Sequence, residues 1–245
     1  MITGKNRRFV WCSVIASSLC LLVSCKDRVF DNPFDPEISE VIFEVVNTIP
    51  TPSAYPLGLA WDGNGLWNVD GSSNTLYCLS RSNGAQIRAL TSPLPSTTGI
   101  AYDGHDLWVC SETSVELYKI NPVSGEIQKR LNLQRGSFTA LAYGQGSLWI
   151  GDLQSNTIMK INPETGEIQF SFANPGVRVD GLTFHQASLW LSDPTNLTIY
   201  ELTSGGSVMR RFLSPGQSPR GLASDGYYLW NADGSQKLYQ LRVLN

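Results

Sequence analysis

Residues 99–109 read Gly-Ile-Ala-Tyr-Asp-Gly-His-Asp-Leu-Trp-Val, and variants of this run recur along the chain at a fixed interval. Five tryptophans mark the repeat at successive spacings of 41, 41, 41 and 40 residues: Trp67, Trp108, Trp149, Trp190 and Trp230. Nine residues before each of them lies a small residue: Gly58, Gly99, Ala140, Gly181 and Gly221. Two markers that keep register across five units establish an internal repeat.

Each unit reads as four short strands separated by turns. The first strand follows the small residue, and an Asp-Gly turn typical of tight hairpins leads to the second strand, which carries the tryptophan. A third strand, such as the one around Leu117-Tyr118, is joined to a fourth, such as residues 126–133, by a turn of the type Asn-Pro-Val-Ser-Gly. No stretch after residue 40 shows the apolar period of a helix. The repeat therefore predicts an all-β fold, a five-bladed β-propeller of four-stranded blades.

The two ends of the repeat region predict how the ring closes. The repeats lie near residues 58–98, 99–139, 140–180, 181–220 and 221–245, and the last one stops before its fourth strand. Residues 40–49, Glu-Val-Ile-Phe-Glu-Val-Val-Asn-Thr-Ile, precede the first repeat as a fourth strand would. We expect this N-terminal strand to complete the last blade, because both sheet edges are then paired. The propeller domain would span residues 39–245.

The repeated residues also predict how the blades pack. Residues i and i+2 of a strand share a face, so the small residues form one face of every first strand. Small side chains let the innermost strands approach one another near the axis. We expect the large tryptophan of each second strand to fill the space between blades, as part of the core and not as a ligand-stacking surface.

The first 24 residues resemble a bacterial lipoprotein signal peptide. Lys and Arg at positions 5, 7 and 8 precede an apolar stretch, residues 9–23, that is too short and interrupted for a good membrane span. The stretch ends in Leu-Val-Ser-Cys at residues 22–25, which resembles the lipobox whose cysteine is acylated. The alternative is an ordinary cleaved signal in which Cys25 is incidental. Residues 25–38 are rich in Pro and Asp and have no period, so we interpret them as a lipid-anchored tether.

A lipid on Cys25 would make the membrane a partner and place the protein at the cell envelope. Two or three acyl chains hold a protein almost permanently, at about 0.8 kcal/mol per buried methylene. Lys26 follows the cysteine where an Asp usually marks inner-membrane retention, so the outer membrane is favoured if the cell is Gram-negative. The formal net charge is −3 and no run of Lys and Arg occurs, which argues against a nucleic-acid partner. An exported compartment permits a disulfide between Cys78 and Cys110, although two buried thiols fit the repeat better.

Acidic residues recur three positions after the repeat tryptophan, in a loop that should lie on the ligand-binding face of a propeller. The residues at this position are Asp70, Ser111, Asp152, Asp193 and Asp233. A ring of carboxylates could hold a hard cation. The residues that follow, Gly71, Pro194 and Gly234, are turn formers, which favours the alternative that each Asp caps its own loop.

The loops that lead into the first strands break the repeat, and divergent positions are where a specific small molecule or protein would be recognised. Asp180 and Arg220 are the two charges of this set and are candidates for the binding face. His105 and His185 lie at different repeat positions on the opposite face, so the sequence supports no metal site, no cofactor and no histidine catalysis.

The repeat resembles known propeller families. Residues 99–109, with Leu-Tyr-Lys-Ile-Asn-Pro-Val-Ser-Gly-Glu-Ile at 117–127, look like repeats of streptogramin-lyase-like and NHL-like propellers. Five blades within residues 41–245 are similar to the plant and bacterial type of glutaminyl-peptide cyclotransferase. That family starts its first blade with a Phe-Thr-Gln-Gly-Leu-like run and has an acidic residue in its site, whereas residues 55–59 here read Tyr-Pro-Leu-Gly-Leu. Streptogramin lyases use a histidine and a metal in a seven-bladed ring.

The sequence favours a membrane-anchored envelope lipoprotein whose propeller binds a ligand or protein without catalysis. This interpretation rests on the regular repeats and on the lack of a recognisable polar cluster. The alternative is a glutaminyl-peptide cyclotransferase-like enzyme, for which we expect a deep pocket with an unpaired carboxylate on the face of the variable loops.

The lipid anchor is testable by labelling with a fatty-acid analogue in bacteria that express the chain. We expect the unaltered chain and a Cys20→Ser control to be labelled, because Leu19 stands where the lipobox needs a small residue. The Cys25→Ser variant should lose the label and either enter the soluble envelope fraction or keep an uncut signal. A label that persists in Cys25→Ser would contradict the assignment.

Overall fold

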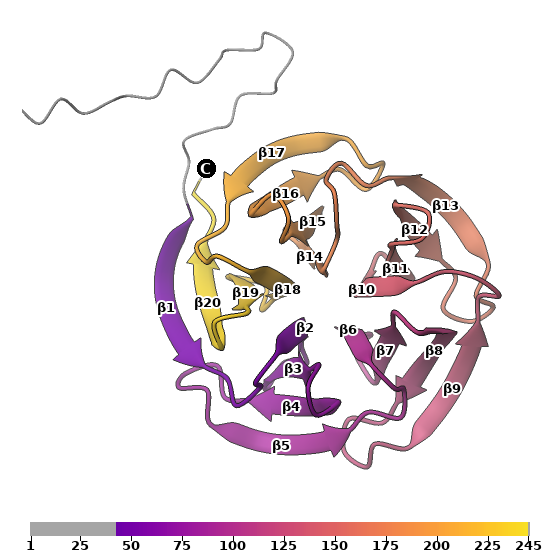
Figure 1. Cartoon of the computed structure of the whole chain (residues 1–245), viewed down its shortest axis with the longest axis horizontal. Helices are drawn as coiled ribbons and strands as arrows, with labels where there is room; N and C mark the ends of the chain where they lie inside the picture. The colour runs from indigo at the N-terminus through magenta and orange to yellow at the C-terminus, as the bar shows by residue number, and fades with distance from the viewer. Residues whose placement is uncertain (1–42, 245) are drawn as a thin grey trace, which may run out of the picture. The chain divides into compact units, whose positions relative to one another are not determined.

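The computed structural model describes residues 43–244, and these residues form a ring of five four-stranded antiparallel sheets (Figure 1). The first blade contains β2 (Pro56–Trp61), β3 (Leu66–Asp70), β4 (Thr75–Leu79) and β5 (Gln86–Thr91), and the second β6 (Thr97–Tyr102), β7 (Leu107–Ser111), β8 (Ser114–Ile120) and β9 (Ile127–Asn132). The third contains β10 (Phe138–Gly144), β11 (Ser147–Asp152), β12 (Thr157–Ile161) and β13 (Ile168–Ala173). The fourth contains β14 (Gly181–His185), β15 (Ser188–Asp193), β16 (Thr198–Leu202) and β17 (Val208–Leu213). The predicted all-β propeller is confirmed.

The fifth blade joins the two ends of the described chain. It contains β18 (Pro219–Ser224), β19 (Leu229–Asp233), β20 (Lys237–Arg242) and the N-terminal strand β1 (Glu44–Pro50). β1 pairs antiparallel with β20 over its whole length, and the Glu44 carboxylate accepts a bond from Arg242 at 2.6 Å. Closure by an N-terminal strand is thus confirmed; residues 40–42 of the expected strand lie outside the described residues.

The innermost strands meet around the axis at positions where only a very small residue fits. β2, β6, β10, β14 and β18 surround the centre of the ring (Figure 1). A Cβ atom on Gly221 would lie 2.4 Å from the carbonyl oxygen of Leu57, and one on Gly181 would lie 2.4 Å from that of Arg220. Both contacts are with backbone that cannot move aside, so the repeated glycine is a packing requirement.

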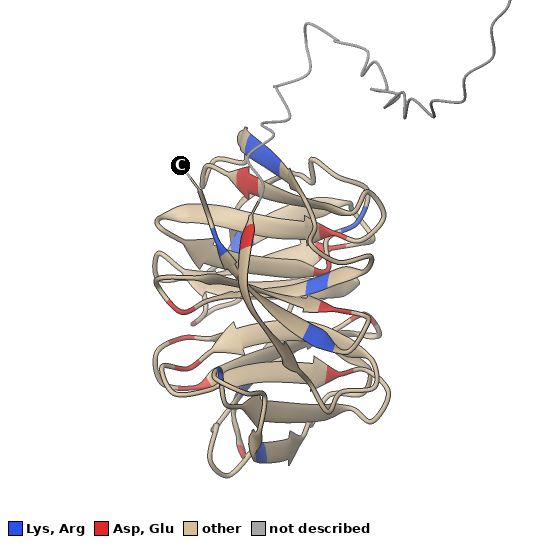
Figure 2. Ribbon diagram, turned by 90° about the vertical axis from the view of Figure 1, so that its left-hand side faces the viewer, with Lys and Arg blue, Asp and Glu red and all other residues tan. Residues whose placement is uncertain are grey.

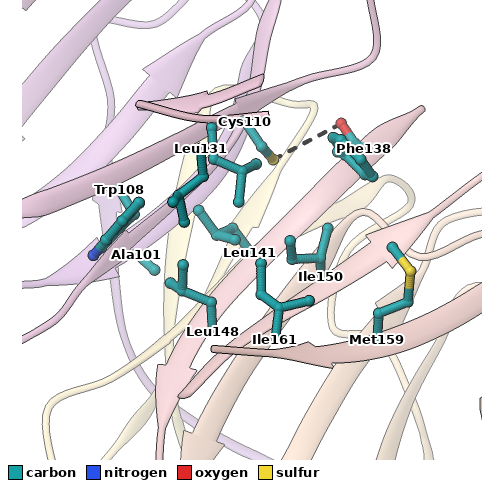
Figure 3. Close-up of a cluster of buried hydrophobic side chains, with 11 residues drawn as sticks. Ala101, Trp108, Cys110, Leu131, Phe138, Leu141, Leu148, Ile150, Met159 and Ile161 are labelled. Carbon is teal, nitrogen blue, oxygen red and sulfur yellow. Dashed lines mark hydrogen bonds between the residues drawn. The ribbon is translucent and has the colours of Figure 1, made fainter. Parts of the chain in front are cut away.

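The core consists of five apolar clusters that lie between neighbouring blades. Each repeat tryptophan is at most 1% exposed and belongs to a different cluster. Trp108 of the second blade, for example, packs with Leu141, Leu148 and Ile150 of the third blade (Figure 3). Trp230 of the fifth blade shares a cluster with Leu59 and Leu66 of the first blade, which closes the circle. The tryptophans are therefore the contacts that hold blade to blade, as the sequence predicts.

In three blades, an Asp of the first hairpin turn accepts a hydrogen bond from the repeat tryptophan, an interaction that the sequence analysis missed. The indole Nε1 of Trp67, Trp108 and Trp230 donates to the carboxylate of Asp62, Asp103 and Asp225, at 2.7, 2.9 and 3.0 Å respectively. Each of these carboxylates also accepts backbone N–H groups of its own turn. The signal was an Asp five residues before the Trp. The turns themselves contain Gly63, Gly104 and Gly226 at positive φ, as the Asp-Gly pattern predicts.

The two cysteines of the propeller are free, and both are buried. Burial raises the pKa of the Cys78 thiol to about 11 and that of the Cys110 thiol to about 12. Both side chains belong to the apolar clusters between blades. Of the two alternatives that the sequence left open for Cys78 and Cys110, the structure shows two buried thiols and not a disulfide.

Charged residues are scattered over the ring. On the side seen in Figure 2, Lys and Arg positions are interspersed with Asp and Glu positions. Within residues 43–244 there is no helix long and apolar enough to cross a membrane.

The closing strand can be tested through Ile49, which is 2% exposed and belongs to the cluster between the fifth and first blades. We expect Ile49→Ala to lower the free energy of unfolding by about 2–5 kcal/mol, because it leaves a cavity in that cluster. Val45 on the same strand is 43% exposed, and Val45→Ala should cost less than about 1 kcal/mol. Urea denaturation measures both; equal effects would show that β1 does not seal the ring.

Candidate functional site

The loops before the first strands and the loops after the second strands lie on the same face of the ring, as the hydrogen bonds between them in every blade show. The last residue of the second strand supplies a carboxylate, which accepts a hydrogen bond from a backbone N–H in the loop before the first strand. The four pairs are Asp70 with Tyr55 at 3.0 Å, Asp152 with Ser137 at 2.8 Å, Asp193 with Val177 at 2.8 Å and Asp233 with Ser218 at 2.9 Å. In the second blade, the hydroxyl of Ser111 donates to the carbonyl of Pro95 at 2.7 Å.

The four repeated aspartates brace loops, which agrees with the capping interpretation of their position. Each also accepts bonds from its own loop, such as those from Ser72 and Ser73 to Asp70. Burial raises the pKa of Asp70, but the hydrogen bonds from Ser73, Ser72 and Tyr55 outweigh it and hold the pKa at about 2. Within residues 43–244, no three His, Cys, Asp or Glu side chains are grouped to hold a metal ion.

The main cavity lies on this face, between the loops of the first, second, fourth and fifth blades. Its volume is about 640 Å³, within the range of small-ligand pockets. Its charged lining residues are Glu112, Arg178 and Arg220, and its hydroxyl-bearing ones include Ser96, Thr97, Thr98, Thr113 and Thr195. Of the candidates from the sequence, Arg220 lines this cavity; Asp152 lines a separate one of about 360 Å³; Asp70, Asp193 and Asp233 line neither.

The glycine ring of the inner strands constricts the channel. There, the space bordered by Gly58, Gly99, Gly181 and Gly221 is too narrow for a water molecule. Asp180 borders the same constriction. A ligand in the main cavity therefore sits in a bowl with no water-wide passage along the axis.

Asp180 is the centre of a chain of ionic hydrogen bonds at this site. Its carboxylate is 4% exposed and accepts one bond from Nε of Arg178 and another from Nη1 of Arg220. Arg178 continues through its Nη2 to Oε1 of Glu112. Arg220 continues through its Nη2 to the hydroxyl of Tyr55, at 3.2 Å, and its guanidinium carbon lies 5.4 Å from the centre of the Tyr55 ring. Loops of four blades are thus linked through one buried carboxylate.

The charges of this network balance, with two guanidinium groups against two carboxylates. Burial lowers the pKa of Arg178, but the neighbouring Asp180 and Glu112 carboxylates raise this pKa by a larger amount. The pKa of Arg178 therefore lies above its usual range. Glu112 uses one carboxylate oxygen for Arg178, and its Oε2 has no hydrogen bond to the described residues. The side chain of Glu112 is 32% exposed, so this oxygen is the acidic group that the site can offer to a ligand.

The family profile of glutamine cyclotransferases matches residues 35–180. The chain belongs to the glutamine cyclotransferase family. Among solved structures, the glutaminyl cyclase of Myxococcus xanthus superimposes with a TM-score of 0.71 and 14% identity, over 83% of this chain and 98% of that one. A catalytically inactive virginiamycin B lyase from Staphylococcus aureus, solved with quinupristin, superimposes with a TM-score of 0.52 and 20% identity, over 80% of this chain and 69% of that one. A comparison with curated proteins gives no match.

Membership of the cyclotransferase family favours the enzyme alternative over the non-catalytic interpretation that the sequence suggested to us. The structural likenesses, at 14% and 20% identity, bear on the fold alone. The expectation that the site lacks a polar cluster was wrong, because the folded loops bring Glu112, Arg178, Asp180 and Arg220 together.

Sequence reasoning missed two charged residues of this cyclotransferase-family site. Arg178 lies two residues before Asp180 in the same variable loop, and a wider window on that loop would have included it. Glu112 directly follows Ser111, the one position where the repeated Asp is absent. That break in the pattern was the available signal.

The role of Asp180 can be tested against Asp70, which is also buried but contacts no arginine in the described residues. We expect Asp180→Asn to lower the free energy of unfolding by about 3–5 kcal/mol, because two guanidinium groups lose their shared charge. Asp70→Asn keeps an acceptor oxygen for its loop and should cost about 1 kcal/mol. Guanidinium denaturation compares the two, and a smaller loss for Asp180→Asn would contradict the central role of this carboxylate.

Proposed function

We propose that this propeller cyclises the N-terminal glutamine of a peptide, and that Glu112 transfers the proton. The observation that carries the proposal is the position of Glu112. It is the one carboxylate among the described residues that lines the main cavity, with one oxygen fixed by Arg178 and the other free. Family membership supports the reaction class.

The reaction needs one proton to move between two nitrogens of the same residue. The α-amino group binds as an ammonium and loses one proton to water, and the free amine then attacks the carbonyl carbon of the side-chain amide, so that a C–N bond forms and a five-membered ring closes. The carboxylate of Glu112 takes the proton that this nitrogen must lose. It then returns the proton to the amide nitrogen as the old C–N bond breaks and ammonia leaves. A single general acid–base group contributes about 10²–10⁴-fold to such a step.

Arg178 suits the second requirement of the reaction, which is stabilisation of the negative charge that develops on the amide oxygen. Its Nε and Nη2 are engaged by Asp180 and Glu112, which fixes the plane of the guanidinium group, while its Nη1 makes no hydrogen bond to the described residues. A fixed donor in a partly dry site stabilises developing charge more strongly than water does. The bowl also limits the orientations of a short peptide, which favours ring closure.

A second candidate function is ligand binding without turnover. The observation in its favour is Leu57, which lines the cavity where the family has the Gln of its Phe-Thr-Gln-Gly-Leu-like run.

We further propose that the protein acts at the cell envelope, held to a membrane through a lipid on Cys25. Support comes from the lipobox-like residues 22–25 and the charged and apolar stretches before them. Cys25 lies outside the described residues. An envelope location would expose the site to exported peptides.

The reaction is tested by incubating the full chain with a glutaminyl peptide and following the mass loss of ammonia above the spontaneous rate. We expect turnover by the unaltered chain and a loss of at least about 100-fold in Glu112→Gln. The matched control is Glu126→Gln, which removes the same charge from an exposed turn of the same blade. Binding of the peptide with no turnover by the unaltered chain would contradict the enzyme and favour the second candidate.

A further inference from the structure

The site carries more hydrogen-bond donors than its own residues use. A guanidinium group has five N–H donors. Arg220 uses Nη1 for Asp180 and Nη2 for Tyr55, while its Nε is buried without a partner among the described residues. Each of its Nη atoms therefore keeps one N–H that the protein does not engage. Surplus donors in a pocket call for a ligand rich in acceptors, and a carboxylate is the acceptor that matches this group best.

The charge of the network points the same way. Asp180 is the one carboxylate bonded to Arg220, and it is shared with Arg178, whereas Arg178 also has Glu112. When the ammonium group of a peptide approaches the free oxygen of Glu112, the balanced network gains one positive charge. A negative group beside Arg220 restores the balance. The arrangement is thus complementary to a ligand with an ammonium group at one end and a carboxylate near the other.

We propose that Arg220, together with the hydroxyl of Tyr55, binds a carboxylate of the substrate, so that the site selects short glutaminyl peptides with a carboxylate close to the glutamine. This inference rests on the proposed function, since it takes the amino group of the glutamine to lie at Glu112. Arg178 and Arg220 are bonded to the two oxygens of one carboxylate, so they lie side by side. An extended peptide advances about 3.5 Å per residue. The carboxylate therefore belongs to the first or second residue after the glutamine.

The size of the cavity agrees with this substrate class. A volume of about 640 Å³ lies in the range that encloses a drug-sized ligand, which a di- or tripeptide is. The constriction beneath has no room for a water molecule, so a bound peptide cannot extend toward it. The carboxylate has two chemical sources, the C-terminus of a di- or tripeptide or an acidic side chain after the glutamine.

A peptide series on the unaltered full chain tests the proposal and separates these sources. The substrates are Gln-Ala, its C-terminal amide, and Gln-Glu with an amidated C-terminus. We expect kcat/KM for Gln-Ala to exceed that for its amide at least about tenfold, because a charge-assisted hydrogen bond is lost in the amide. High activity on Gln-Glu amide would assign the subsite to an acidic side chain, and low activity would assign it to the C-terminus. Equal activity on all three peptides overturns the proposal.

Variants of Arg220 connect the preference to this residue. In Arg220→Gln, the ratio of kcat/KM for Gln-Ala to that for its amide should fall to about one, whatever the variant does to the overall rate. Arg135→Gln is the matched control, because it removes the same charge from an exposed residue in the loop before β10. Arg220→Lys keeps a charge beside Asp180 and should retain part of the preference, which covers the case that Arg220→Gln does not fold. A preference unchanged in Arg220→Gln and Arg220→Lys overturns the assignment.

A peptide that cannot cyclise distinguishes failure of this inference from failure of the proposed function. Met-Ala has a first side chain of similar length to that of glutamine but without the side-chain amide. Calorimetry compares the binding of Met-Ala with that of its C-terminal amide. Carboxylate-dependent binding of Met-Ala with no turnover of Gln-Ala would support the carboxylate subsite and contradict the proposed enzyme activity. Turnover of Gln-Ala and its amide at equal rates would keep the enzyme and remove the subsite. No binding of Met-Ala together with no turnover would remove both.

Discussion

The burial of one tryptophan between each pair of neighbouring blades is the interaction on which the rest of this structure depends. Each indole is removed almost completely from water, and at about 25 cal/mol per Å² over 150–250 Å² this burial is worth roughly 4–6 kcal/mol. A single blade cannot cover its own tryptophan, because the covering residues belong to the next blade. The repeat is therefore stable only as a closed ring, and the strand β1 is what closes it.

Closure has a direct consequence for the centre of the molecule. Five inner strands converge so tightly that glycine backbone touches neighbouring backbone, which constricts the channel at that level. The loops at this end add to the inter-blade clusters through residues such as Leu94 and Val179, and the repeated Asp braces hold the loops in place. Loops fixed at their base and free at their tips can vary in sequence while the ring stays the same. The centre of the site lies where such loops join the inner strands, since Asp180 directly precedes β14 and Arg220 is the second residue of β18.

The site is held together by electrostatics in place of apolar packing. A buried carboxylate such as that of Asp180 is costly unless it is paired and hydrogen-bonded, and two guanidinium groups meet that need. The same pairing orients both arginines and leaves donors on each for a ligand. Glu112 at one end and Tyr55 at the other extend the network across the bowl, so that one carboxylate, two guanidinium groups and a phenol line one cavity.

The spacing of Trp and Gly determined by itself the number of blades and the inter-blade position of the indoles. The turns within each repeat determined the four strands of a blade, and the missing fourth strand of the last repeat indicated the strand that closes the ring. These features follow from short-range periodicity and from the burial of large side chains, and both are legible in a repeated sequence. The site was only partly predictable: Asp180 and Arg220 were visible as charges that break the repeat, but their partners were not. Arg178 and Glu112 come from loops 66 residues apart in the chain, and no periodic pattern relates them. Only the tertiary structure decided that these side chains contact one another. Ring closure brings variable loops of different blades to one cavity, where the buried Asp180 carboxylate requires positively charged partners.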